Sequence, residues 1–301
     1  MAMPNGPKSI EMESLTKFYG AHKGIEELTL TAEPGEVLGF LGPNGSGKTT
    51  TIRVLLGFLR PTAGRAAVLG LDIARQSLEI RRRVGYLPGD VSLYGERTGA
   101  ELLDFALRVR GLKESPLVAT VAEALDAPMH RPVKKLSRGM RQKVALVLTF
   151  AHDPELLILD EPTSGLDPLA QRAVLDLLDS EGKRGKTVFF SSHVLSEAEQ
   201  ICDRVAILKA GRLVVLDSVD SLRSRKYKEV TVVYKGNPPV LDGLEDVQVV
   251  WRHDGRITFR VKGDLNRLLA ALQGTELEDL SIAEPSLEEV FLDYYRDGGQ
   301  Q

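Results

Sequence analysis

The sequence predicts an α/β domain built on a parallel sheet, with a helical insert, and a small α+β domain after it. The apolar runs at 37–41 and 156–159 are typical of strands that are covered on both faces of such a sheet. A glycine-rich turn follows the first run, and two acidic residues follow the second. Between them, helix-periodic sequence from residue 98 to about 151 predicts the insert.

Composition sets broad limits on the function. The chain has 301 residues, of which 43% are hydrophobic and 27% charged, as expected for a globular protein with one large domain and a small one. The net charge of −3 gives no general attraction for nucleic acid, so we expect no nucleic-acid partner. Cys202 is the only cysteine, which excludes an internal disulfide and a cysteine-based metal site.

The sequence also predicts where the protein works. Its first residues lack the apolar stretch of a secretory signal. No apolar run approaches the ~20 residues that are needed to span a bilayer. We therefore expect a cytoplasmic protein that reaches a membrane only through a partner.

The glycine-rich turn matches the pattern G-x-x-x-x-G-K-[ST] of a phosphate-binding P-loop. An expected strand precedes it and an expected helix at 51–59 follows it, which disfavours a chance turn. In such a loop the backbone N–H groups point at phosphate oxygens, Lys48 neutralises the β- and γ-phosphates, and the Thr49 hydroxyl ligates Mg²⁺. The expected nucleotide-binding residues are Gly42, Pro43, Asn44, Gly45, Ser46, Gly47, Lys48, Thr49 and Thr50.

Two strand-like runs occupy residues 9–41, ahead of the P-loop helix, and Tyr19 lies between them. An aromatic residue at this place suits two roles. It can stack on an adenine base, or it can fill the core. The residues alone favour neither.

Capping signals divide the insert into helices. Thr98 and Glu101 have the spacing of a capping box, which starts the first helix. Ser115, followed by Pro116 at the first helical position, starts the second. Ser137 is expected to cap the third.

Asp160 and Glu161 end the second buried strand, at the edge where α/β sheets bind their ligands. Asp160 is placed to hold Mg²⁺, directly or through water, and Glu161 to orient or deprotonate an attacking water. A strand that merely ends in an acidic turn is the alternative, which the complete P-loop disfavours. His193 follows a buried strand at 187–190. A lone histidine at a strand end is more often a surface or core residue than a catalytic one, but its place at the same edge strengthens the case for catalysis.

Further signals complete the first domain. Asp167 and Pro168 open a helix, and Ser196 with Glu199 predicts a capping box at the next one. A closing pair of strands is expected around Gly211.

These motifs together resemble the ATP-binding subunit of ABC transporters, over residues 9 to about 217. Residues 42–49 are similar to the Walker A motif and residues 156–160 to Walker B. Asp167 lies in a stretch similar to the loop after Walker B, which is called the D-loop. His193 is similar to the switch histidine, and Tyr19 falls where the adenine-stacking aromatic of the family lies. The part that resembles the signature motif contains Ser137, Arg138, Gly139 and Met140.

The resemblance implies an ATPase that works as a head-to-tail homodimer, with ATP and Mg²⁺ sandwiched between the subunits. Ser137 and Gly139, at a helix N-terminus, would then face the γ-phosphate held by the other subunit. Glu161 and His193 would serve hydrolysis once the dimer closes.

Two features depart from the family's pattern. A glutamine that contacts Mg²⁺ and signals to the membrane subunit usually stands where this chain has Gly89, so that role is vacant or passes to Asp90. Arg138 and Met140 stand where Gly and Gln are most common. Both departures resemble the multidrug-efflux branch, whose ATPases pair with a separate permease.

Composition changes after residue 216, and we divide the chain into an ABC ATP-binding domain at 1–220, with a helical subdomain at about 90–151, and an extension at 221–301. The extension resembles one found on many efflux-type ABC ATPases. The extension is expected either to stabilise or regulate a dimer, or to pack passively against its own ATPase domain. The sequence favours neither role. Its expected strands lie at 230–234, 247–251, 257–261 and 277–282, and its expected helices at 265–272 and 286–294.

The leading hypothesis is an ATP-hydrolysing subunit that powers export of a small hydrophobic compound or drug. A separate membrane permease would contact that compound, with the ATPase at the inner face of the cell membrane. A soluble ABC ATPase acting in DNA repair or translation is the alternative, which the lack of a long coiled-coil insert disfavours. A switch that binds ATP without hydrolysing it is a third possibility, against which Glu161 and His193 argue.

Overall fold

The computed structural model describes residues 7–224, 228–239, 244, 247–261 and 265–283. The chain forms two compact units, at 1–216 and 217–301. The helix expected at 286–294 lies outside the described residues. Within the described ranges, no helix is both long and apolar enough to cross a membrane.

The first unit is built around a six-stranded sheet with the order β10-β9-β3-β8-β7-β6. The pairs β9–β3, β3–β8, β8–β7 and β7–β6 are parallel. Every residue of β3 and β7 is buried, which confirms the two strands predicted from continuous apolar runs. The six strands are β3 (Val37–Leu41), β6 (Val84–Leu87), β7 (Leu156–Asp160), β8 (Thr187–Ser192), β9 (Arg204–Lys209) and β10 (Arg212–Ser218).

A second sheet in this unit has the order β2-β1-β4-β5. Helix α1 (Lys48–Leu55) contacts this sheet and strand β7 of the parallel sheet, so its apolar side chains join the two layers. The helix expected at 51–59 begins and ends earlier than predicted, because the left-handed Gly47 leads directly into it and the left-handed Gly57 follows it. The strands are β1 (Ile10–Tyr19), β2 (His22–Ala32), β4 (Ala63–Val68) and β5 (Leu71–Asp72), and helix α2 (Ser77–Arg83) follows them.

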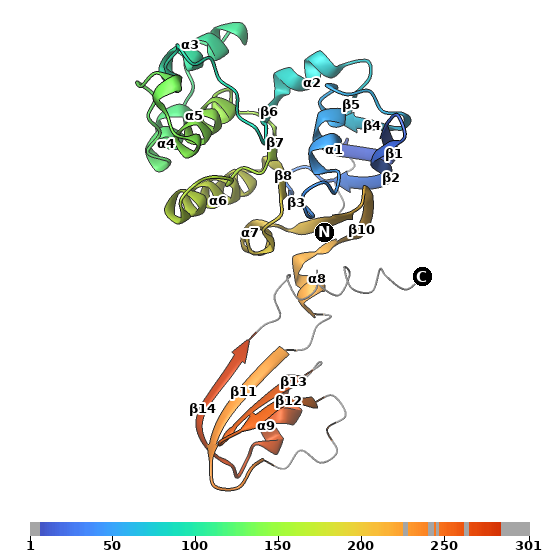
Figure 1. The fold of residues 1–301 in the computed structure, drawn as a ribbon, viewed down its shortest axis with the longest axis vertical. Helices are drawn as coiled ribbons and strands as arrows, with labels where there is room; N and C mark the ends of the chain where they lie inside the picture. Colours follow the sequence, from blue (N-terminus) through green and yellow to red (C-terminus); the bar gives the residue numbers. More distant parts are fainter. Residues whose placement is uncertain (1–6, 225–227, 240–243, 245–246, 262–264, 284–301) are drawn as a thin grey trace. The chain divides into compact units, whose positions relative to one another are not determined.

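Helices α3 (Gly99–Val109), α4 (Leu117–Ala124) and α5 (Arg138–Phe150) group on the opposite side of the parallel sheet from β1 and β2 (Figure 1). A 3₁₀ turn at Val133–Lys135 precedes α5. The predicted capping box of α3 is confirmed, since both of its hydrogen bonds are present. The side chain of Ser137 accepts from the Met140 N–H, which confirms the cap of α5. Helix α4 starts one position after Pro116, although the Ser115 hydroxyl still accepts from its first N–H.

Helix α6 (Pro168–Lys183) begins as predicted, because the Asp167 carboxylate accepts from the Ala170 N–H. This bond also lowers the pKa of Asp167. The capping box predicted at Ser196 and Glu199 is wrong. Helix α7 (Leu195–Ile201) already begins at Leu195, with no side-chain cap on its N-terminus. A turn in which the Ser192 hydroxyl accepts from the Val194 N–H brings the chain into the helix earlier.

The second unit contains an antiparallel sheet with the order β12-β13-β11-β14. Helix α9 (Leu265–Ala271) packs on it, and Leu268 of the helix shares a buried cluster with Val230 and Phe259 of the sheet. These elements confirm the strands expected in the extension and the first of its two helices. The remaining elements are α8 (Val219–Ser224), β11 (Lys228–Lys235), β12 (Val247–His253), β13 (Arg256–Val261) and β14 (Glu276–Ala283).

Candidate active site

The C-terminal ends of three neighbouring strands carry the predicted site. In the parallel sheet, β8 lies between β3 and β7. The P-loop follows β3, Asp160 and Glu161 lie at the end of β7, and His193 follows β8. Because the three strands are parallel, these groups meet at one edge of the sheet.

The backbone of the P-loop requires glycine. Gly47 has φ 110°, and a Cβ added there would lie 2.8 Å from the Gly24 carbonyl oxygen. A Cβ at Gly42 would lie 2.6 Å from Ser46 Oγ. Lys48, the first residue of α1, is buried, and its ammonium donates to the Gly42 carbonyl at 2.6 Å. The loop therefore curls around the lysine head group.

A cavity of about 310 Å³ opens at the P-loop, and Tyr19, Lys23, Gly24 and Glu161 line it together with the loop. Tyr19 is 44% exposed, so it does not fill the core. Of the two roles considered for it, only stacking on an adenine base remains. Its hydroxyl lies 3.4 Å from Thr50 Oγ1. The tyrosine thus stands at the wall of the cavity.

Two hydroxyls hold the Asp160 carboxylate. Thr49 Oγ1 donates to Asp160 Oδ2 at 2.7 Å, and Ser191 Oγ donates to Asp160 Oδ1 at 2.6 Å. Asp160 is 1% exposed. Hydroxyl and carboxylate oxygens are the donors that Mg²⁺ prefers, and Mg²⁺ needs few protein ligands because it keeps waters and binds phosphates. The oxygens of Thr49 and Asp160 therefore fit a Mg²⁺ ion.

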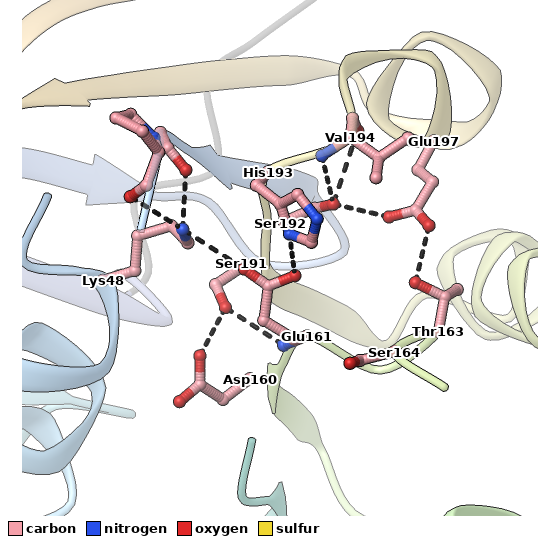
Figure 2. Close-up of polar contacts among 12 residues, drawn as sticks. Lys48, Asp160, Glu161, Thr163, Ser164, Ser191, Ser192, His193, Val194 and Glu197 are labelled. Atoms are coloured by element: carbon pink, nitrogen blue, oxygen red, sulfur yellow. Dashed lines mark hydrogen bonds and ion pairs between the residues drawn. The ribbon is translucent and has the colours of Figure 1, made fainter. Parts of the chain in front are cut away.

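Glu161 bridges the P-loop and His193. Its Oε1 lies 3.2 Å from Lys48 Nζ, and its Oε2 lies 2.7 Å from His193 Nδ1 (Figure 2). The backbone of Glu161 has φ 53°, a left-handed conformation that is uncommon for residues other than glycine. The Glu161 N–H donates to both the carbonyl and the hydroxyl oxygen of Ser191, which holds this conformation. The direction of the carboxylate is therefore fixed by the neighbouring strand.

The signature-like residues lie apart from this cavity. Arg138 Nη2 donates to Ser164 Oγ at 3.2 Å, so the N-terminus of α5 contacts the loop after β7. A Cβ at Gly139 would lie 2.7 Å from the Gly165 carbonyl oxygen, and glycine is required for this close approach. Among the described residues that line the cavity of the P-loop, none belongs to the set Ser137, Arg138, Gly139 and Met140.

Gly89 lies beside the Asp160 carboxylate. A Cβ added at Gly89 would lie 3.1 Å from Asp160 Oδ2, so its backbone occupies space next to the possible metal ligands. The neighbouring Asp90 is exposed. The segment after β6 thus approaches the site through its backbone.

Four further polar residues, which the sequence interpretation did not assign, hold the loops of the site. Gln142 of α5 donates from Nε2 to the Pro162 carbonyl at 3.0 Å. The Glu197 carboxylate of α7 accepts from the hydroxyls of Thr163 and Ser192. No spacing rule links these residues, because Thr163 and Glu197 are 34 positions apart and meet only when α7 packs on the sheet.

The fold and the site define an α/β P-loop ATPase. Residues 25–164 match the family described as ABC transporter, and residues 218–295 match the one described as ATP-binding protein DrrA1-3-like, C-terminal domain. The chain belongs to the ATP-binding proteins of the ABC transporter family, and it is an ATP-hydrolysing transporter subunit.

Relatives support this membership over nearly the whole chain. The bacitracin transport ATP-binding protein BcrA of Bacillus licheniformis is 36% identical, over 94% of this chain and 96% of its own length. The Nod factor export ATP-binding protein I of Rhizobium etli is 32% identical, over 94% of this chain and 92% of its own. A solved ATP binding subunit of an ABC transporter is 33% identical, with a TM-score of 0.65, and covers 71% of this chain and 91% of its own.

Proposed function

We propose that this ATPase powers export of a small hydrophobic compound or drug through a separate membrane permease. The Glu161 carboxylate carries the hydrolytic part of the proposal, because it reaches Lys48 with one oxygen and His193 with the other. The proposed base for water therefore lies beside the group that would hold the phosphates. The names of the relatives, which refer to bacitracin transport and Nod factor export, support the export part.

ATP would lie in the cavity of the P-loop. The P-loop N–H groups and the Lys48 ammonium would bind the β- and γ-phosphates, with the start of α1 adding its dipole. Thr49 and Asp160 would hold Mg²⁺, which neutralises phosphate charge when bound. Tyr19, at the cavity wall, would stack on the adenine ring.

The Glu161 carboxylate would orient or deprotonate the attacking water. His193 would hold that carboxylate through the contact between Nδ1 and Oε2. Phosphoryl transfer is accelerated mainly by positioning and by charge stabilisation, so the relative placement of these two side chains decides the rate.

A second copy of the chain would complete each site. The N-terminus of α5 carries Ser137 and Gly139 but does not line its own cavity. In a head-to-tail homodimer, the Ser137 hydroxyl and the first N–H groups of α5 would bind the γ-phosphate held by the partner. Arg138 and Met140 would flank that contact, and Asp167 would lie in the interface loop.

We place the permease contact at a second cavity of about 300 Å³ in the first unit. The cavity lies between the segment after β6, which contributes Pro88 and Leu93, and helices α3 and α5, which contribute Ala106 and Leu148. Asp90 lies in this segment, next to Gly89, and would take over signalling to the permease. The ATPase would then work on the cytoplasmic side, at the inner face of the membrane.

Reconstitution of the chain with its permease in vesicles tests this function. We expect ATP-dependent transport of a hydrophobic dye by the wild type and none by Glu161→Gln, which keeps its affinity for ATP. Equal transport by both proteins would contradict the role of Glu161. Stimulation of ATP hydrolysis by DNA or ribosomes instead of the permease would favour the DNA-repair or translation alternative.

A further inference from the structure

Glu197 lies buried between the two loops that carry Glu161 and His193. Its side chain comes from α7, and the residue is 5% exposed. Its Oε1 accepts from Thr163 Oγ1 at 2.5 Å, and its Oε2 accepts from Ser192 Oγ at 2.5 Å (Figure 2). Both hydroxyl residues are buried as well. One oxygen of this carboxylate is thus bonded to the loop after β7, and the other to the last residue of β8.

These bonds complete a closed ring of contacts. Thr163 follows Glu161 by two positions, and Ser192 directly precedes His193. The ring closes where His193 Nδ1 meets Glu161 Oε2 at 2.7 Å. A movement that separates Thr163 from Ser192 must therefore break a bond to Glu197.

The hydroxyl of Ser192 strengthens this restraint on His193. Its single proton goes to Glu197 at 2.5 Å, which is much closer than the Val194 carbonyl at 3.4 Å, and its oxygen accepts from the Val194 N–H at 2.9 Å. His193 stands between these two residues, so the Ser192 hydroxyl, which is bonded to the Glu197 carboxylate, also holds the backbone on the far side of His193. Hydrogen bonds to an ionised carboxylate are shorter and stronger than those between neutral groups, and a carboxylate can accept at both oxygens.

We propose that Glu197 is a positioning residue for ATP hydrolysis, which sets the placement of Glu161 relative to His193. The inference rests on the proposed roles of those two side chains. Glu197 acts through Thr163 and Ser192 and contacts neither Glu161 nor His193 in any hydrogen bond that the structure describes. A misplacement of about 1 Å costs on the order of 10²-fold in rate, so loosening the loops lowers kcat.

Glu181 provides a matched control. It is also a glutamate that is 5% exposed. Glu181 lies in helix α6, and its carboxylate accepts from the guanidinium of Arg184, the residue directly after the helix. Replacing Glu181 shows how far the loss of a buried carboxylate alone lowers the stability of the protein. It leaves the loops of the site untouched.

The test compares Glu197→Ala, Glu197→Gln and Glu181→Ala by steady-state ATP hydrolysis, fluorescent-nucleotide affinity and Tm. We expect Glu197→Ala to lower kcat about 10- to 100-fold while KM and nucleotide affinity change less than about threefold. Glu197→Gln keeps the size of the side chain and one acceptor oxygen, so it should retain more activity. Glu181→Ala should lower Tm and leave kcat within about twofold of the wild type.

A double-mutant cycle with Thr163→Val tests whether the carboxylate acts through this hydroxyl. We expect Glu197→Ala with Thr163→Val to lower kcat no further than Glu197→Ala alone. Additive losses, or a kcat of Glu197→Ala within about twofold of the wild type, would overturn the proposal. If Glu197→Ala does not fold, the kcat values of Glu197→Gln and Ser192→Ala test the proposal instead. An unchanged kcat in both variants would overturn the proposal. Hydrolysis that persists in Glu161→Gln would refute the proposed function separately, since that variant leaves the bonds of Glu197 intact.

Discussion

Glu161 Oε2 lies 2.7 Å from His193 Nδ1, and the two side chains come from the ends of adjacent parallel strands. The other oxygen of the same carboxylate lies 3.2 Å from the ammonium of Lys48. One side chain therefore connects the loop expected to bind phosphate with the loop that carries the histidine. Under the proposed roles of these side chains, hydrolysis should depend on the alignment of all three strands.

Replacing Glu161 by Gln should abolish turnover. The amide keeps the shape of the side chain but cannot take a proton from water, and general-base catalysis contributes about 10²- to 10⁴-fold. Nucleotide affinity should persist, because the P-loop is unchanged, and the ATP-bound dimer should accumulate. Phosphate release and sedimentation with ATP measure the two effects. Unchanged steady-state hydrolysis would remove Glu161 from the proposed role.

Replacing Lys48 by Ala should remove ATP binding. Lys48 is 6% exposed, its ammonium donates to the Gly42 carbonyl, and it is the only lysine or arginine within residues 42–50, so the loop itself offers no second cation. Hydrogen bonds to charged groups contribute about 1.5–3 kcal/mol, and affinity should fall more than about tenfold. Fluorescent-nucleotide titration measures this loss. Lys186→Ala, which removes a lysine paired with Asp153, is the control, and retained affinity in Lys48→Ala would count against the P-loop assignment.

The sequence predicts the helix starts that depend on hydrogen bonds between residues close together in the chain. The capping residues Thr98, Ser137 and Asp167 start helices as expected, because each bonds to an N–H within its own first turn. The start of α7 was missed, because a turn at Ser192 sets it in place of the expected box at Ser196.

The contacts between strands could not be predicted in the same way. The sequence predicts that β3, β7 and β8 are buried strands, but it does not predict their order in the sheet, in which β8 separates the other two. The left-handed backbone of Glu161 and the two bonds of Glu197 depend on this packing. Such long-range contacts leave no periodic pattern in a single sequence.

Two glycines of the P-loop should differ in their tolerance of alanine. Gly45 has φ 81° and no atom within 4 Å of an added Cβ, so Gly45→Ala should cost only the left-handed strain of about 1–2 kcal/mol. At Gly47 the new methyl group would also lie 2.7 Å from Ile25 Cγ2. Gly47→Ala should therefore destabilise the protein further and abolish nucleotide binding. Urea denaturation and nucleotide titration of both variants test this, and equal effects would contradict the close approach at Gly47.

Removal of the chain after residue 223 should leave the ATPase unit folded. The buried cluster of the first unit and that of the second share no residue, so each unit has its own core. If the second unit stabilises the homodimer, the truncated Glu161→Gln protein should associate more weakly with ATP present. Sedimentation velocity compares the truncated and full-length proteins, with Tm as the control for folding. Unchanged association would favour passive packing of the extension.

Acidification should destabilise the protein partly through His152. Burial, together with the nearby Arg110, lowers the pKa of His152 to about 4, from an ordinary value of 6.5. The unfolded chain takes up the proton at a higher pH than the folded one. The stabilisation is therefore fully present above pH 6.5 and is lost as the pH falls toward 4.

Between pH 6.5 and 5 this linkage amounts to about 2 kcal/mol at most, and the partial exposure of the residue reduces it to about 1 kcal/mol. His152→Phe should be less sensitive to pH in this range, because the substituted ring cannot bind a proton. His130→Gln, at an exposed histidine, should follow the wild type. Urea denaturation at pH 7, 6 and 5 measures the three curves. A loss of stability in His152→Phe as large as that of the wild type would show that the acid sensitivity lies in other groups.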